Sequence, residues 1–189
     1  MFDGFLRVAA ATPDIRVADC NFNGASAAAL VSEAYEQGVS LLVLPELCLT
    51  GYTCSDLFLQ ESLLDGAGKA LLTLTEATRD KNMVVLAGLP LTVNGVLYNV
   101  AAVLHDGDIL GFVPKSYLPT YSEFYEGRHY HSGADIEADV LFNGRTYPFG
   151  TRLLFRCRQM PAFTLGIEIC EDLWVAQPPS ISHAPVSYT

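Results

Sequence analysis

Short apolar runs alternate along the chain with longer amphipathic segments. Phe5–Ala11 and Leu41–Leu44 are apolar runs that predict buried strands, and a proline lies shortly after each run. Between them, a segment that Asn21 or Asn23 can cap and that Gly38 closes predicts a helix. A strand, a helix and a strand in this order predict two parallel neighbours in the sheet of an α/β fold.

The rest of the chain predicts one further helix and then mostly strands. A second helix is expected over Leu57–Arg79, with a break near Asp65-Gly66. Three Asn-Gly or Asp-Gly pairs predict hairpin turns, at Asn94-Gly95, Asp106-Gly107 and Asn143-Gly144. Further strands are expected at Met83–Leu89, Val96–Leu104, Ile109–Val113, Leu153–Cys157 and Thr164–Ile169, followed from Gln177 onward by a loop with no further helix or strand.

Three side chains of different chemistry follow the ends of predicted strands. Glu46 lies just beyond Leu41–Leu44, Lys115 follows the strand that stops at Pro114, and Cys170 ends the strand that begins at Thr164. Ligands of α/β sheets bind outside the carboxyl ends of the strands, so these side chains are candidates for a common site. Each also has an ordinary explanation, as a core thiol, a solvated loop glutamate and a surface lysine.

The composition excludes several classes of function. The 189-residue chain carries a net charge of −10, which argues against nucleic acid or an anionic membrane as a partner. No apolar run is long enough for a membrane span, and the first residues show no secretory signal. The cysteines are odd in number, lack paired zinc spacing and are expected to be free thiols in the cytoplasm: Cys20, Cys48, Cys54, Cys157 and Cys170.

The segment Ser116–Gly133 is long, irregular and rich in aromatic residues. A loop of this length in a compact domain is usually functional, although an aromatic surface cluster would explain it too. The segment includes His129 and His131, but two histidines without a third ligand at a useful spacing do not form a metal site. No metal is therefore expected in this chain.

Three motifs in register resemble the carbon–nitrogen hydrolase (nitrilase) superfamily. They are Leu-Pro-Glu-Leu-Cys-Leu-Thr-Gly-Tyr at 44–52, Pro-Lys-Ser-Tyr-Leu-Pro-Thr-Tyr at 114–121 and Gly-Ile-Glu-Ile-Cys-Glu-Asp-Leu-Trp at 166–174. The last motif, together with Phe124-Tyr125-Glu126, is most similar to the N-terminal glutaminase domain of the glutamine-dependent NAD synthetases. The resemblance covers almost the whole chain and implies an α-β-β-α sandwich.

The resemblance also implies the roles of the three strand-end residues. Glu46 would act as the general base, Lys115 would stabilise the oxyanion and Cys170 would be the nucleophile. Such a thiol attacks an amide, releases ammonia and leaves a thioester that water then hydrolyses. The backbone N–H of Glu171 would assist at the oxyanion.

Further residues are assigned by the resemblance alone. Glu126 would be the second, supporting glutamate of the family. Glu171 would bind the α-amino group of glutamine, and Tyr121 and Phe124 would line the substrate pocket. Tyr52, at the end of the first motif, is assigned to the same supporting or substrate-binding group.

Two departures from the family pattern lead to further expectations. The family domain continues well past the nucleophile, so residues 1–189 are expected to be a glutaminase domain that is incomplete at its C-terminus. No phosphate-binding loop of a synthetase domain is present, so ATP, Mg and deamido-NAD would belong to a domain absent from this chain, while the hydrolase step needs no cofactor. Such a chain would expose an apolar strand edge or bury it in a homo-oligomer.

Three functions remain open from the sequence alone. The first is glutamine hydrolysis that supplies ammonia to a synthetase. The second is the reaction of a stand-alone carbon–nitrogen hydrolase, an amidase or carbamoylase. The third is an inactive fragment that serves as an assembly module.

Overall fold

Strands and helices alternate over residues 8–93 in the computed structural model, which describes residues 4–187, and most of the later elements are strands. The expected domain covers residues 1–189 and so extends beyond the described residues. The start of the chain, where no secretory signal is expected, lies partly outside them too. The elements are β1 (Val8–Ala10), α1 (Cys20–Glu36), β2 (Leu41–Val43), η1 (Ser55–Leu59), α2 (Glu61–Ala77), β3 (Val84–Val93), β4 (Val96–His105), β5 (Asp108–Pro114), η2 (Glu126–Arg128), β6 (Glu137–Phe142), β7 (Arg145–Gly150), β8 (Phe155–Arg156), β9 (Thr164–Leu165), η3 (Cys170–Leu173) and α3 (Pro179–Ser187).

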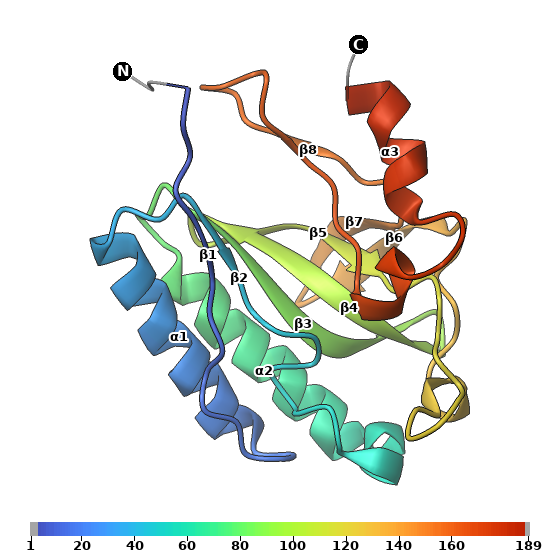
Figure 1. Ribbon diagram of the computed structural model, residues 1–189. Helices are drawn as coiled ribbons and strands as arrows, with labels where there is room; N and C mark the ends of the chain where they lie inside the picture. Colours follow the sequence, from blue (N-terminus) through green and yellow to red (C-terminus); the bar gives the residue numbers. More distant parts are fainter. Residues whose placement is uncertain (1–3, 188–189) are drawn as a thin grey trace.

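A seven-stranded mixed sheet in the order β1-β2-β3-β4-β5-β7-β6 forms the centre of the fold (Figure 1). β1, β2 and β3 are parallel, as the strand–helix–strand pattern predicts, and β3, β4 and β5 are antiparallel. The predicted hairpin turns at Asn94-Gly95, Asp106-Gly107 and Asn143-Gly144 are all confirmed, with positive φ at both residues of each pair.

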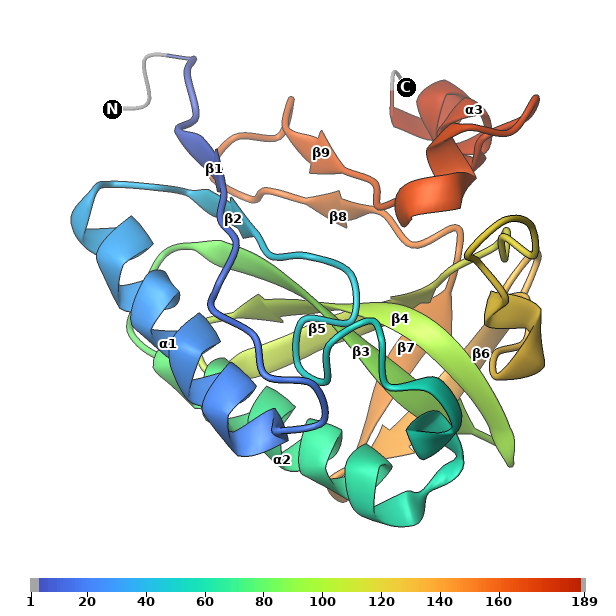
Figure 2. The ribbon, with the colours of Figure 1, turned by 60° about the horizontal axis from the view of Figure 1, so that its bottom comes forward.

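Helices α1 and α2 lie side by side and cover one face of this sheet (Figure 2). Small residues allow their close approach: a Cβ atom on Gly24 would meet the Cβ of Ala70 at 3.0 Å, and one on Gly66 would meet Sγ of Cys20 at 3.3 Å. The helices and the sheet bury the larger apolar cluster of the described residues between them.

The opposite face of the sheet carries β8, β9 and α3 (Figure 2). A second apolar cluster packs there, in which Ile167 and Ile169 meet Leu86, Val103 and Val113 of the central strands. The chain segment that leads to Cys170 therefore covers the face that α1 and α2 leave open. The expected α/β class is confirmed.

Two predictions about the helices are corrected by the structure. The side chain of Asp19, and not Asn21 or Asn23, caps α1 by accepting a hydrogen bond from the N–H of Phe22. The second helix is interrupted at Gln60, between η1 and α2, and is continuous through Asp65-Gly66. Gly66 is used for helix–helix contact and does not break the helix.

Two predictions about the C-terminal third are also wrong. The expected strand Thr164–Ile169 is reduced to β9, which pairs only with β8 and ends five residues before Cys170. Ile169 has extended backbone angles, but its N–H bonds to the Asp172 carboxylate and not to a neighbouring strand. The expected loop after Gln177 contains the helix α3, which begins at Pro179, a position where proline fits a helix start.

None of the helices within residues 4–187 combines the length and the apolar character needed to cross a bilayer.

Candidate active site

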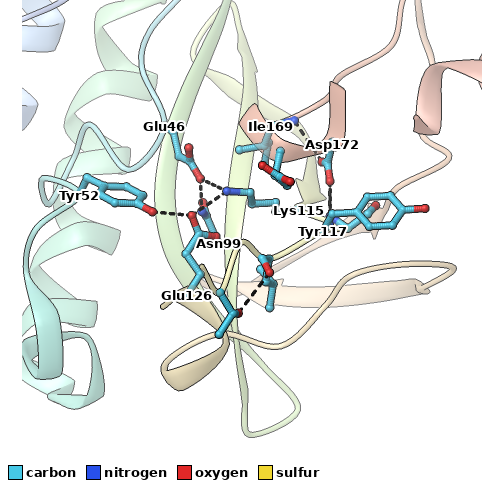
Figure 3. Close-up of polar contacts among 12 residues, drawn as sticks. Glu46, Tyr52, Asn99, Lys115, Tyr117, Glu126, Ile169 and Asp172 are labelled. Atoms are coloured by element: carbon cyan, nitrogen blue, oxygen red, sulfur yellow. Dashed lines mark hydrogen bonds and ion pairs between the residues drawn. The ribbon is translucent and has the colours of Figure 1, made fainter. Parts of the chain in front are cut away.

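A buried lysine lies between two carboxylates at one end of the central sheet (Figure 3). Nζ of Lys115 is 2.7 Å from Oε1 of Glu46 and 2.7 Å from Oε1 of Glu126. The side chains of Lys115 and Glu126 are 0% and 5% exposed, and that of Glu46 is 16% exposed. The structure therefore brings together three residues that the sequence analysis singled out separately.

Lys115 is held by backbone bonds on both sides of the residue. Its N–H donates to the carbonyl of Asn99 on β4, at 2.9 Å, and its carbonyl accepts from the N–H of Gly133, at 2.8 Å. The side chain is buried and points toward Glu46 and Glu126 (Figure 3). The alternative explanation of Lys115 as an ordinary surface lysine is therefore wrong.

Glu46 follows β2 at a place where the chain passes very close to β3. A Cβ atom on Gly88 of β3 would meet the backbone carbonyl carbon of Glu46 at 2.8 Å, so only glycine allows this approach. Oε1 of Glu46 also accepts a hydrogen bond of 2.5 Å from Nδ2 of Asn99. The glutamate is thus fixed by β3 and β4 as well as by Lys115, and it is not a solvated loop side chain.

Asn99 is a site residue that the sequence analysis missed. It is buried on β4, and its side chain faces Glu46 while its carbonyl accepts from Lys115. Its Oδ1 has no hydrogen-bond partner among the described residues. The one sequence signal for Asn99 is its position in the predicted strand Val96–Leu104, on a face that could be buried.

Burial and the neighbouring charges shift the pKa values of Lys115 and Glu126. Burial lowers the pKa of Lys115, but Glu46 and Glu126 raise it by more, so that its pKa lies above the ordinary value and the ammonium form is kept. Burial raises the pKa of Glu126, and hydrogen bonds from Lys115 and Tyr52 partly oppose this. A positive charge is therefore held permanently beside two carboxylates.

Cys170 lies at the start of η3, beside the same cluster. The thiol is exposed and free. Together with Glu46, Gly88 and Asn99, Cys170 lines a cavity of about 190 Å³. Partial desolvation of the thiol and the charge of Glu46 raise the pKa of Cys170, while the Lys115 ammonium lowers it. The resting thiol is thus kept protonated next to a carboxylate that can accept its proton.

The remaining predicted residues form an aromatic wall around the acidic groups. Tyr52 donates a hydrogen bond of 2.7 Å from its hydroxyl to Oε1 of Glu126, and Tyr121 donates one of 2.9 Å to Oε2 of Glu171. The ring of Phe124 packs edge-on against the rings of both tyrosines, with centroids 6.4 Å and 5.8 Å away. All the predicted site residues thus belong to one connected group.

The histidines of the long loop make other contacts. Nε2 of His129 lies 3.1 Å from Oδ1 of Asp56, which also pairs with Arg128. Within residues 4–187 no three His, Cys, Asp or Glu side chains are grouped in a way that suits a metal ion.

Known proteins resemble this chain over most of its length. The family model for carbon-nitrogen hydrolases matches residues 7–181. A glutamine-dependent NAD(+) synthetase of Mycobacterium tuberculosis is 44% identical over 181 residues, which are 96% of this chain and 27% of the relative. The chain thus spans 27% of the length of that relative.

Solved structures give the same result. A glutamine-dependent NAD(+) synthetase from Cytophaga hutchinsonii matches with a TM-score of 0.80 and 29% identity, over 88% of this chain and 28% of that one. An amidase from Nesterenkonia sp. matches with a TM-score of 0.58 and 24% identity, over 76% of this chain and 54% of that one, a likeness of the fold alone.

Proposed function

Because this chain belongs to the carbon–nitrogen hydrolase family, we propose that it hydrolyses the side-chain carboxamide of glutamine through a thioester on Cys170. The observation that carries the proposal is the buried Lys115 ammonium, 2.7 Å from Glu46 and beside the Cys170 thiol. This combination of a thiol, a carboxylate and a fixed cation suits acyl transfer from an amide. The choice of glutamine rests on the relatives, which are named glutamine-dependent NAD(+) synthetases.

The first half of the reaction forms the thioester. Glu46 takes the proton of the Cys170 thiol as Sγ attacks the carboxamide carbon. The oxygen that becomes negative is stabilised by the Lys115 ammonium and the backbone N–H of Glu171. As the tetrahedral intermediate collapses, Glu46 returns the proton to the nitrogen, the carbon–nitrogen bond breaks and ammonia leaves.

The second half regenerates the enzyme. Glu46 takes a proton from a water molecule, whose oxygen attacks the thioester carbon. The same two groups stabilise the second oxyanion, and the carbon–sulfur bond breaks to release glutamate as the thiol regains its proton. Glu126 acts through Lys115 by fixing the position and charge of the ammonium.

Glutamine would be held by the residues around the triad. Glu171 carries a carboxylate that can pair with the α-ammonium group of the substrate, and Tyr121 orients this carboxylate. Tyr52 and Phe124 supply aromatic walls for the aliphatic part of the side chain. The proposed compartment is the cytoplasm, and a homo-oligomer is the proposed assembly.

The released ammonia would serve the amidation of deamido-NAD. We assign ATP, Mg and deamido-NAD to that separate synthetase step, since the hydrolysis described above uses only side-chain and backbone groups of this chain and water. Residues 1–189 are proposed to be the glutaminase domain of such a system.

A comparison of substrates tests the proposal. The chain is assayed for ammonia release from glutamine, from simple aliphatic amides and from N-carbamoyl amino acids. The proposal expects kcat/KM to be highest for glutamine and turnover to vanish in Cys170→Ala. A preference for aliphatic amides or carbamoyl substrates would assign the chain to a stand-alone amidase or carbamoylase, and no turnover of any of them would favour the assembly module.

A further inference from the structure

A buried carboxylate outside the triad joins the segments that carry Lys115 and Cys170 (Figure 3). Oδ1 of Asp172 accepts hydrogen bonds from the backbone N–H groups of Ser116 at 3.0 Å and Tyr117 at 2.8 Å. Its Oδ2 accepts one from the N–H of Ile169 at 3.1 Å. A single side chain thus binds the residues immediately after Lys115 and the residue immediately before Cys170.

The backbone at Cys170 needs such support. Its φ of 48° lies in the left-handed region, which is unfavourable for a residue with a Cβ atom. The bond from Ile169 to Asp172 closes the first turn of η3, and it fixes the residue that precedes this unfavourable conformation. No ladder of β-sheet hydrogen bonds reaches Cys170, because β9 ends at Leu165.

Asp172 differs from an ordinary helix cap in its burial and in the number of N–H groups that it binds. The residue is 2% exposed, and burial raises its pKa, which the three N–H donors and the charge of Lys115 oppose. Asp19 provides the comparison, because its carboxylate caps α1 through the N–H of Phe22 and pairs with the exposed Arg16. Asp172 therefore combines an ordinary capping role with a link across the site.

We infer that Asp172 is a positioning residue that sets Sγ of Cys170 against the carboxylate of Glu46 and the ammonium of Lys115. The inference rests on the proposed function, in which these three groups act on one carbonyl carbon. A displacement of about 1 Å between reacting groups can lower a rate on the order of 100-fold. Asp172 touches no reacting atom, so it acts through the backbone on both sides of the site.

The test uses the chain as it is, with the variants Asp172→Ala and Asp172→Asn. In Asp172→Asn the side-chain oxygen can still accept from Ser116 and Tyr117, but the amide group faces the N–H of Ile169 as a second donor. Only the link to the Cys170 side is then lost. Asp19→Ala is the matched control, since it also removes a carboxylate that accepts a backbone N–H.

The first readout is glutamine turnover. We expect Asp172→Ala to lower kcat by about 100-fold and to change KM by less than about threefold, because the substrate-binding side chains are retained. Asp172→Asn should have a smaller defect of the same kind. Asp19→Ala should lower the thermal midpoint of unfolding without changing kcat.

The second readout needs no substrate. The rate of alkylation of Cys170 by iodoacetamide is followed against pH, where the thiol faces Glu46, Lys115 and Glu126. In the otherwise unchanged chain, Glu46→Gln should move the profile to lower pH, because the Glu46 charge raises the pKa of the thiol. In the Asp172→Ala background this shift should be lost, since the thiol no longer faces residue 46.

The outcomes separate the inference from its alternatives. If Asp172→Ala does not fold, the same two readouts are measured in Asp172→Asn, and they test the inference. A folded variant with unchanged kcat, or with an intact response of the thiol to Glu46→Gln, would overturn the inference. If the chain does not hydrolyse glutamine but the alkylation response depends on Asp172, the proposed substrate fails and the positioning role stands.

Discussion

Nζ of Lys115 lies 2.7 Å from Oε1 of Glu46, although the two residues are 69 positions apart in the chain. They follow β5 and β2, which are not neighbours, because β3 and β4 lie between them in the sheet. Asn99 on β4 bridges this gap with its side chain to Glu46 and its carbonyl to Lys115. The ion pair therefore depends on the register of the intervening strands.

Replacement of Lys115 by methionine should abolish turnover and also weaken the fold. An ordinary surface lysine could be replaced with little effect on folding, but the side chain of Lys115 is 0% exposed. Its loss leaves Glu46 and Glu126 facing each other, and an uncompensated buried charge costs about 3 kcal/mol or more. Urea unfolding and glutamate release measure the two effects.

The double variant Lys115→Met/Glu126→Gln separates stability from catalysis. Removal of the second charge should recover much of the lost free energy of unfolding, because only one carboxylate is then left without its partner. Activity should stay at least about 100-fold down, because the oxyanion still lacks its cation. Recovery of both the free energy of unfolding and the activity would assign Lys115 a purely structural role.

Glu46→Gln should have opposite effects on the reactivity of Cys170 in two assays. The Glu46 charge raises the pKa of the thiol, so its removal lowers this pKa and moves the pH profile of alkylation downward. Glutamine turnover should fall at least about 100-fold, since the general base is lost. An unchanged alkylation profile would mean that Glu46 does not face the thiol.

Gly88→Ala should impair the site through the backbone. The added methyl group would lie 2.8 Å from the carbonyl carbon of Glu46, so the chain after β2 has to move. We expect kcat to fall by at least about tenfold and the protein to be destabilised by about 1–3 kcal/mol. Gly68→Ala is the control, because its methyl group would meet only the ring of Phe142 at an ordinary 3.5 Å.

Tyr52→Phe removes one of the groups that keep Glu126 ionised. The Tyr52 hydroxyl lowers the pKa of Glu126, so the pKa of this carboxyl should rise further in the variant. The acidic limb of the pH profile of kcat should therefore move to higher pH, with activity at neutral pH about tenfold down. An unchanged acidic limb would show that Glu126 does not control the charge state of the site. Tyr35→Phe serves as the control, because Tyr35 lies on α1.

Local sequence signals predicted those parts of the fold that are determined locally. The Asn-Gly and Asp-Gly turns were found because their backbone conformation requires few residue types. Glu46 and Lys115 were found because both follow apolar strands that end abruptly. Glu46 and Lys115 lie close together because β2 and β5 end at the same edge of the sheet.

Residues that act through tertiary contacts gave no such signal. Asn99 stands in the middle of an apolar strand, and its role arises only when Glu46 and Lys115 approach from other elements. Asp172 follows Glu171 directly in the sequence and carries no local signal of its own, although it is buried and caps η3. The strand expected before Cys170 is shortened to β9, and at its expected end the N–H of Ile169 bonds to the Asp172 carboxylate instead of a neighbouring strand.

Covalent trapping of Cys170 is the most direct test of the account. The chain is incubated with a glutamine-analogue electrophile, digested and mapped by mass spectrometry, beside the Cys170→Ala variant and with an excess of glutamine as competitor. We expect one adduct on Cys170, protection by glutamine and no adduct in the variant. Labelling that survives Cys170→Ala, or that another of the five cysteines carries, would contradict it.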